Sequence, residues 1–303
     1  MRVTVSDVVS PSYFVALAAV ELGYFKAEGV DAEFVLPPPD GSKALRAGEI
    51  DFLGASPYVA FMDFPGWREG KVLCALSQHT YWFLAVRAAL GARKGDVNAV
   101  KGLRLSASAQ PGMALQRVLK IGGIDFARDN VRIVPPPRPT DHNHARVGAQ
   151  ALDEDLADGF WGNGMRAEYA VRRGLATVLL DVRRGDGPKG AEDYTFPALV
   201  TTEQLTRDHP EAAAGAVRAI VKTQQALRAD PALSAKAAAR LFPTEEAGMI
   251  TELITRDLPF FDAAVTREAI AGASQFAQAL GLLKGPVSYE QVVATELAPL
   301  WKG

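Results

Sequence analysis

The feature that most constrains the fold is an order of strands and helices that occurs twice in the chain. The first occurrence reads strand, helix, strand, short helix, strand, at residues 2–6, 11–28, 32–36, 42–47 and 50–53. The second has the same order, at residues 103–106, 113–121, 131–134, 147–154 and 158–161. A β-α-β-α-β order predicts a parallel sheet with crossover helices. The sequence therefore predicts two similar α/β lobes.

A proline triplet follows the second strand in both halves, at Pro37–Pro39 and at Pro135–Pro137. The run ALRAGEIDFL at 44–53 also matches ALDEDLADGF at 151–160. Alanine-rich helices and apolar strands look alike in unrelated chains, but the aligned triplets favour a true repeat. The second half carries nine extra residues before its matching run, at 138–146.

After about residue 190 the pattern becomes mostly helical. Helices are predicted at 208–227, 231–241, 244–255, 266–280 and 289–300. We expect this tail to pack on the first lobe. The predicted fold class is α/β, two-lobed, with a mainly parallel sheet flanked by helices in each lobe.

Composition narrows the classes of function. The chain of 303 residues has 33 basic and 35 acidic side chains, which argues against a nucleic-acid partner. No apolar run approaches the ~18–20 residues of a membrane span, so no membrane insertion is expected. Residues 1–6 lack the pattern of a secretory signal. We expect a periplasmic or other extracytoplasmic protein if a signal has been removed, and a cytoplasmic one otherwise.

Motifs for catalysis and metal binding are missing from the sequence. The one cysteine, Cys74, lies in an apolar run typical of a buried strand, which predicts an inert thiol. Four scattered histidines form no HExxH or other metal motif. No GxSxG, Walker or GxGxxG motif is present. We therefore assign no catalytic residue, no metal and no cofactor, and expect a binding protein rather than an enzyme.

Polar loops follow the predicted strands in both halves. Ligands of open parallel sheets bind beyond the carboxyl ends of the strands, where helix N-termini offer free N–H groups. Any one of these loops could hold capping residues alone, but six of them in matched positions favour a cleft for a small molecule. They contribute the candidate ligand-binding residues Ser10, Ser12, Tyr13, Gly41, Ser42, Ala55, Ser56, Ser108, Gln110, Gly112, Trp161 and Asn163.

Aromatic and histidine side chains extend this set. Tyr13 and Trp161 are predicted to face a planar or apolar part of the ligand, although rings near strand ends also serve as core. His79 follows a strand, and His142 and His144 lie in the nine-residue insert. These histidines are candidates for hydrogen bonds to an acidic ligand group, with a solvated loop as the alternative.

Residues 14–33, which contain Gly23-Tyr24-Phe25 and Glu28-Gly29-Val30-Asp31, resemble the opening of a family of solute-binding proteins. This family binds aliphatic sulfonates, taurine, nitrate and thiamine-pyrimidine precursors. Its second signature resembles residues 44–52 followed by Gly54-Ala55-Ser56-Pro57, and weaker likenesses continue at 101–112 and 196–212. The resemblance covers nearly the whole chain.

The resemblance implies a type II periplasmic-binding-protein fold. Lobe one would be 1–86 with 192–303 and lobe two 87–191, with hinges near 85–87 and near 194–196, where Thr195 is a further ligand candidate. It implies capture of a small organic anion, with an aromatic or heterocyclic body as one option, between the lobes. The partner would be an ABC permease, and the binding protein a monomer.

Two other classes stay open. One is a cytoplasmic hydrolase, lyase or decarboxylase on the same scaffold, with His79, His142 or His144 as acid or base. The other is a ligand sensor. The family also includes enzymes that use cysteines, among them a desulfinase with a cysteine in its first strand–helix loop. That loop here reads Ser10-Pro11-Ser12, which disfavours this chemistry.

Overall fold

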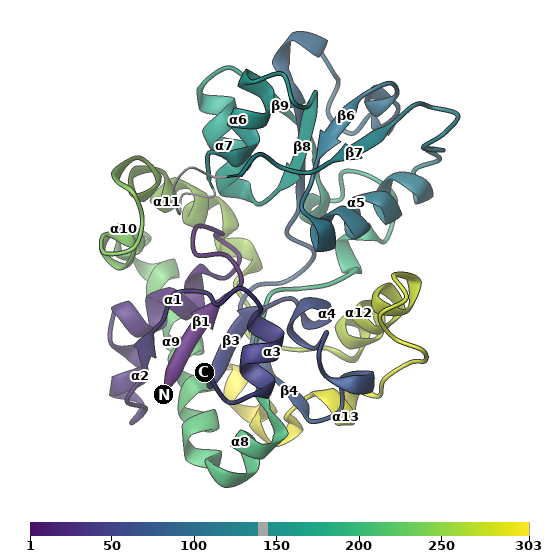
Figure 1. Ribbon diagram of the computed structural model, residues 1–303. Helices are drawn as coiled ribbons and strands as arrows, with labels where there is room; N and C mark the ends of the chain where they lie inside the picture. The colour runs from purple at the N-terminus through teal and green to yellow at the C-terminus, as the bar shows by residue number, and fades with distance from the viewer. Residues whose placement is uncertain (139–144, 303) are drawn as a thin grey trace. The chain divides into compact units, whose positions relative to one another are not determined.

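A computed structural model describes residues 1–138 and 145–302 (Figure 1). The chain divides into two compact units. Unit 1 comprises Met1–His79 with Asp193–Gly303, and unit 2 comprises Thr80–Glu192. His142 and His144 lie outside the described residues, so their predicted role stays a prediction.

Unit 1 is built on a five-stranded sheet of order β2-β1-β3-β10-β4. Its strands are β1 (Arg2–Val5), β2 (Glu33–Phe34), β3 (Phe52–Ala55), β4 (Gly70–Ala75) and β10 (Ala198–Thr202). β1 pairs in parallel with β2 and β3, whereas β10 runs antiparallel to both β3 and β4. Four strands therefore point one way, and the strand that arrives last in the chain points the other way.

Helices cover both faces of this sheet. Gly54 faces α1 (Phe14–Glu21), because a Cβ there would meet the side chain of Ala16. The next residue towards the N-terminus, Leu53, faces α3 (Gly41–Arg46) on the other side, because a Cβ at Gly41 would meet its side chain. This alternation is the two-residue period of a strand. α4 (Pro57–Ala60) also contacts β3 and β10. All six residues from Phe14 to Ala19 are buried, which fits a helix enclosed on every side.

The helical tail packs back on unit 1, as predicted. α9 (Pro210–Ala229) contacts α1 and β4, and Figure 1 shows the purple α1 beside the green α9 despite their distance in sequence. Near the C-terminus, the Trp301 indole donates a hydrogen bond of 2.8 Å to the carbonyl of Leu73 in β4. The other helices of the tail are α8 (Glu203–Asp208), α10 (Leu233–Ala238), α11 (Thr244–Asp257), α12 (Arg267–Ala279), α13 (Tyr289–Val292) and the 3-10 segments η6 (Leu258–Phe260) and η7 (Thr295–Lys302).

Unit 2 repeats the plan with a five-stranded sheet of order β7-β6-β8-β5-β9. Its strands are β5 (Phe83–Arg87), β6 (Arg104–Ser106), β7 (Arg132–Val134), β8 (Gly159–Gly162) and β9 (Ala176–Asp181). β6 is parallel to β7 and β8, and β5 is antiparallel to β8 and β9. The antiparallel strand thus holds the fourth place in both sheets, which confirms the predicted repeat at the level of topology.

Three helices flank the sheet of unit 2. Gly112 of α5 (Ala109–Ile121) lies against Ile133 of β7. α6 (Val147–Asp153) approaches β8 so closely that a Cβ at Gly148 would lie 2.7 Å from the ring of Phe160. α7 (Gly164–Arg172) contacts β5 and β9. Short 3-10 segments complete the two units at η1 (Pro65–Trp67), η2 (Ala88–Leu90), η3 (Val97–Val100), η4 (Val182–Arg184) and η5 (Ala191–Asp193).

The α/β class with a mainly parallel sheet in each unit is confirmed, with one antiparallel strand in each sheet, and one predicted helix is corrected. The sequence predicts a single helix over 11–28, but the chain forms α1 and then α2 (Tyr24–Ala27). Gly23 breaks the helix because its φ is +80°, a left-handed conformation that favours glycine. No helix in the described ranges is both long and apolar enough to cross a bilayer.

Candidate functional site

The candidate ligand-binding residues of unit 1 gather at one edge of its sheet. β1, β2 and β3 are parallel, so their carboxyl ends lie at the same edge, together with the end of β4 and the start of the antiparallel β10. We call this the carboxyl edge of unit 1. The segments that leave or reach it carry Ser10, Ser12, Tyr13, Gly41, Ser42, Ala55, Ser56, His79 and Thr195.

Four hydroxyls at this edge form two close pairs. The Ser10 and Ser12 hydroxyl oxygens are 2.9 Å apart, and both side chains are buried. The phenolic oxygen of the half-buried Tyr13 lies 3.4 Å from the hydroxyl of Ser56. Desolvation raises the pKa of Tyr13 above its ordinary value, and the Asp7 carboxylate adds to this. The phenol therefore stays protonated and can donate a hydrogen bond at neutral pH.

Ser56 and Ser108 occupy the N-cap positions of α4 and α5, yet in the described structure neither hydroxyl caps its helix. Serine at this position usually accepts a hydrogen bond from the first turn. Elsewhere in the chain such bonds do form, for example from Lys43 to Asp40 and from Ala269 to Thr266. The Ser56 hydroxyl lies beside that of Tyr13 instead, and neither serine serves its helix as a side-chain cap.

Three of the candidate ligand-binding residues, Ser42, Gly41 and Ala55, occupy positions that the packing of unit 1 explains. The buried Ser42 hydroxyl accepts a hydrogen bond of 2.9 Å from the amide of Asp63, which joins α3 to the segment after α4. Gly41 lies at the start of α3, where a Cβ would meet the Leu53 side chain, and Ala55 is buried within β3. Their part in ligand binding stays a prediction.

Beyond β4, the carboxyl edge holds a histidine–aspartate pair. His79 Nδ1 lies 3.0 Å from a carboxylate oxygen of Asp193, and both side chains are about half exposed. His79 has a φ of +63°, which is uncommon for a residue other than glycine. Thr195, two residues beyond Asp193, is buried.

Ser77 was missed by the sequence reasoning. It follows β4 at the same edge and is 0% exposed. Its hydroxyl has no hydrogen-bond partner among residues 1–138 and 145–302. Buried hydroxyls are nearly always paired, so an unpaired one calls for an explanation. A serine directly after a buried strand was the available signal, as it was for Ser56.

In unit 2 the matching edge carries the second group of candidates. Ser108 precedes α5, whose first turns contain the exposed Gln110 and the buried Gly112. Asn163 follows β8 in the place that Ser56 holds after β3. Its side-chain oxygen accepts a hydrogen bond of 3.0 Å from the amide of Arg166, so it caps α7. Capping of α7 therefore accounts for the side-chain oxygen of Asn163, and its part in ligand binding stays a prediction.

Trp161 lies at the end of β8 and is only 2% exposed. Its ring lies 5.5 Å from that of Trp82, tilted by 43°. The indole nitrogen has no hydrogen-bond partner in the described part of the chain. Buried indoles usually find an acceptor, so this N–H is a second buried donor without a bond.

The same edge of unit 2 contains a compact basic and aromatic arrangement. The buried Arg183 guanidinium lies 4.3 Å from the ring centre of Tyr81. The Tyr81 hydroxyl approaches the first residue of α7, Gly164, so closely that a Cβ there would collide with it.

Unit 2 as a whole carries 17 basic and 12 acidic residues, against 16 basic and 23 acidic residues in unit 1.

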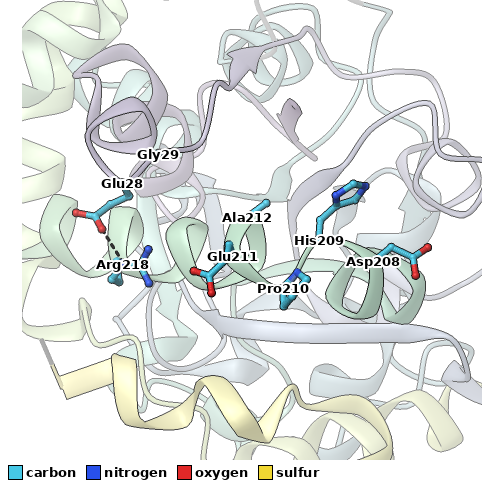
Figure 2. A pocket seen from close by; sticks show the side chains of 8 residues that line it. All are labelled: Glu28, Gly29, Asp208, His209, Pro210, Glu211, Ala212 and Arg218. Carbon is cyan, nitrogen blue, oxygen red and sulfur yellow. Dashed lines mark hydrogen bonds and ion pairs between the residues drawn. The ribbon is translucent and has the colours of Figure 1, made fainter.

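A hollow of about 600 Å³ lies elsewhere in unit 1 (Figure 2). It is formed by the end of α2 and the start of α9. Because β10 runs antiparallel, α8 and α9 follow it at the edge where β1 and β3 begin, opposite the carboxyl edge. Figure 2 shows Glu28 and Arg218 at one end and His209 and Asp208 at the other. The hollow contains none of the predicted ligand-binding residues.

The described residues support neither thiol chemistry nor a metal site. Cys74 is fully buried in β4, and burial raises the pKa of its thiol, so the reactive thiolate is suppressed. No group of three or more histidine, cysteine, aspartate or glutamate side chains is arranged to hold a metal ion within the described ranges.

Comparisons with known proteins define the class of fold. No family model matches the chain, and no curated protein matches it by sequence. Solved structures of periplasmic solute-binding proteins match it along nearly its whole length. The chain therefore has the two-lobed type II periplasmic-binding-protein fold that the sequence resemblance implied.

Three of these structures illustrate the range. The alkanesulfonate-binding protein SsuA from Xanthomonas axonopodis pv. citri, bound to MOPS, has a TM-score of 0.72 at 16% identity and covers 97% of each chain. The nitrate-binding protein NrtA from Synechocystis PCC 6803 has a TM-score of 0.68 at 15% identity, and the match covers 98% of this chain and 86% of NrtA. The desulfurization enzyme DSZB has a TM-score of 0.65 at 17% identity, and the match covers 98% of this chain and 97% of DSZB. Identities this low show the fold alone.

Proposed function

We propose that this protein binds a small organic anion, with a sulfonate or carboxylate head, and presents it to an ABC-type importer. The observation that carries the proposal is the set of hydroxyls at the carboxyl edge of unit 1. Ser10, Ser12, Ser56 and a protonated Tyr13 lie there in two pairs, and the Ser56 hydroxyl caps no helix. Neutral donors of this kind suit the oxygens of an anion.

Unit 2 supports the same ligand charge. Its excess of basic residues attracts anions, and its carboxyl edge adds the hydroxyl of Ser108 and the side chains of Trp161 and Asn163. The half-buried Trp82 ring, which packs on Trp161, offers an apolar surface for a ligand body. Sulfonate-binding and nitrate-binding proteins with this fold support the choice of an anion.

The loop chemistry favours binding over turnover. The first strand–helix loop holds serines, and the one thiol of the chain is buried in a strand. Buried serine hydroxyls without a neighbouring base are weak nucleophiles. A ligand held by these groups is expected to leave unchanged.

The test is a calorimetric titration of the purified, dialysed protein against taurine, MOPS, benzenesulfonate, benzoate and nitrate, with choline as a cationic control. We expect at least one sulfonate or carboxylate to bind with a micromolar Kd or tighter and choline to give no heat of binding. Mass spectrometry of the recovered ligand should show the intact compound. Binding of choline but of none of the anions would refute the ligand class, and a converted ligand would refute the binding-only role.

The transport role has its own test. Cells with and without the gene are compared for uptake of the labelled anion that binds most tightly in vitro. We expect uptake to fall severalfold without the protein. Unchanged uptake, with binding intact, would point to a sensor rather than an importer component.

A further inference from the structure

The chain passes between its two units twice, at residues 79–80 and at residues 192–193. The two passages are bonded to each other on both sides of the junction. In unit 2, the amide of Thr80 donates a hydrogen bond of 2.7 Å to the carbonyl of Glu192. In unit 1, His79 Nδ1 lies 3.0 Å from the Asp193 carboxylate. The outgoing and returning segments are thus joined by one main-chain hydrogen bond and one hydrogen-bonded histidine–carboxylate pair.

The outgoing segment is held in an unusual backbone conformation. His79 has a φ of +63°, in the left-handed region that residues other than glycine and asparagine seldom enter. Just before it, the Gln78 amide donates to the carbonyl of Phe260 at 2.7 Å, and the Gln78 side chain donates to the carbonyls of Asp262 and Ala264, each at 2.9 Å. These bonds anchor the segment up to His79 to unit 1.

The returning segment is anchored by α12. The carbonyl of Asp193 lies so close to Gly272 that a Cβ there would collide with it. The ring of Tyr194 stacks on Phe276 of the same helix, with centres 4.9 Å apart and planes 16° from parallel. Both segments are therefore fixed to unit 1 up to the residues that form the pair.

We propose that His79 and Asp193 form a clasp that holds the two connecting segments together, so that both junctions bend as one hinge. Without the clasp, each segment can change its own torsions at residues 79–80 or 192–193, and the bond between Thr80 and Glu192 breaks more often. This role concerns the chain itself and holds whatever ligand the protein binds.

Amide hydrogen exchange at Thr80, measured without ligand, tests the clasp. In Asp193→Asn the exchange of this amide should be about threefold to fivefold faster, which corresponds to the loss of a partly exposed pair. His79→Asn removes the ring but tolerates the left-handed conformation, and it should give a similar increase. The double variant should exchange no faster than either single one, because both remove the same contact.

Two controls separate the clasp from general effects. Asp208→Asn removes another exposed pair, with Arg207, and should leave Thr80 exchange unchanged. At pH 5, where an ordinary histidine is mostly charged, salt at about 1 M screens exposed pairs, so it should speed Thr80 exchange in the wild type but not in Asp193→Asn. The effect of salt on the wild type needs no substitution, so it tests the clasp even if a variant folds poorly.

Two results would overturn the clasp. One is equal Thr80 exchange in the wild type and Asp193→Asn, with no effect of salt. The other is additive acceleration in the double variant, which would show that His79 and Asp193 act separately. Neither result would bear on the proposed ligand, which is measured by titration.

Discussion

The hydroxyl of Tyr13 lies 3.4 Å from that of Ser56, although 43 residues separate them in the chain. The contact joins the loop after β1 to the loop after β3, because those parallel strands are neighbours in the sheet. This pair is the place where the proposed ligand site can be tested most directly.

Removing either hydroxyl should weaken binding of the sulfonate or carboxylate that the titration identifies. A hydrogen bond to a charged group contributes about 1.5–3 kcal/mol, so Tyr13→Phe and Ser56→Ala should each raise Kd about tenfold to a hundredfold. Calorimetry measures the change. Tyr24→Phe, which changes a half-buried tyrosine of α2, is the matched control and should bind as the wild type does. Equal Kd values for Tyr13→Phe and Tyr24→Phe would remove Tyr13 from the site.

Ser77→Ala should stabilise the protein without ligand. The Ser77 hydroxyl is buried and has no hydrogen-bond partner in the described ranges, so its deletion relieves a desolvation cost of about 1 kcal/mol. Urea unfolding should show a higher midpoint at constant slope. Ser234→Ala is the matched control, since that equally buried hydroxyl donates to Pro231 at 2.6 Å and its loss should destabilise. A lower midpoint in Ser77→Ala would contradict the prediction.

Gly164→Ala should destabilise unit 2 by about 1–3 kcal/mol, because the added methyl group collides with the Tyr81 hydroxyl. Gly248→Ala, in an open helical position of α11, should instead stabilise the protein by about 0.5–1 kcal/mol. Tyr81→Phe should relieve part of the loss caused by Gly164→Ala. A double variant whose loss equals the sum of the two single losses would show that this contact is not the cause.

Glu28 should make stability depend on pH at the acid end. Hydrogen bonds from Lys222 at 2.5 Å and Arg218 at 2.6 Å lower the pKa of this carboxyl in the folded state. The unfolded chain then binds a proton at a higher pH, near the ordinary value of about 4.3, than the folded chain does. The contribution of Glu28 is therefore complete above that value and is lost as the pH falls below it.

Glu28→Gln should cost about 0.5–1 kcal/mol at pH 7 and progressively less towards pH 3. Unfolding midpoints in urea across this range measure the difference. Glu211→Gln is the control. Glu211 lines the same hollow, but in the described structure its carboxylate is bonded to neither Lys222 nor Arg218 (Figure 2). A loss in Glu28→Gln that stays constant down to pH 3 would contradict the assignment.

Much of the fold could be predicted because it depends on local pattern. The proline triplets follow the second strand of each half, and the matching runs at 44–53 and 151–160 lead into the third strand. These third strands are β3 and β8, which lie near the ends of the two runs. The predicted helix over 11–28 failed at Gly23, since helical spacing alone does not reveal a glycine in a left-handed conformation.

The candidate site was predicted as a set of loops but not as a set of contacts. The order of strands and helices, the polar loops after the strands and the absence of a thiol in the first loop could be read from the chain, because these features depend on neighbouring residues. The folded chain was needed to show that β10 and β5 enter their sheets antiparallel, that Tyr13 meets Ser56, that Asp193 meets His79 and that the buried Ser77 hydroxyl has no partner in the described ranges. Such contacts join residues far apart in the chain, and the packing of a whole unit sets them.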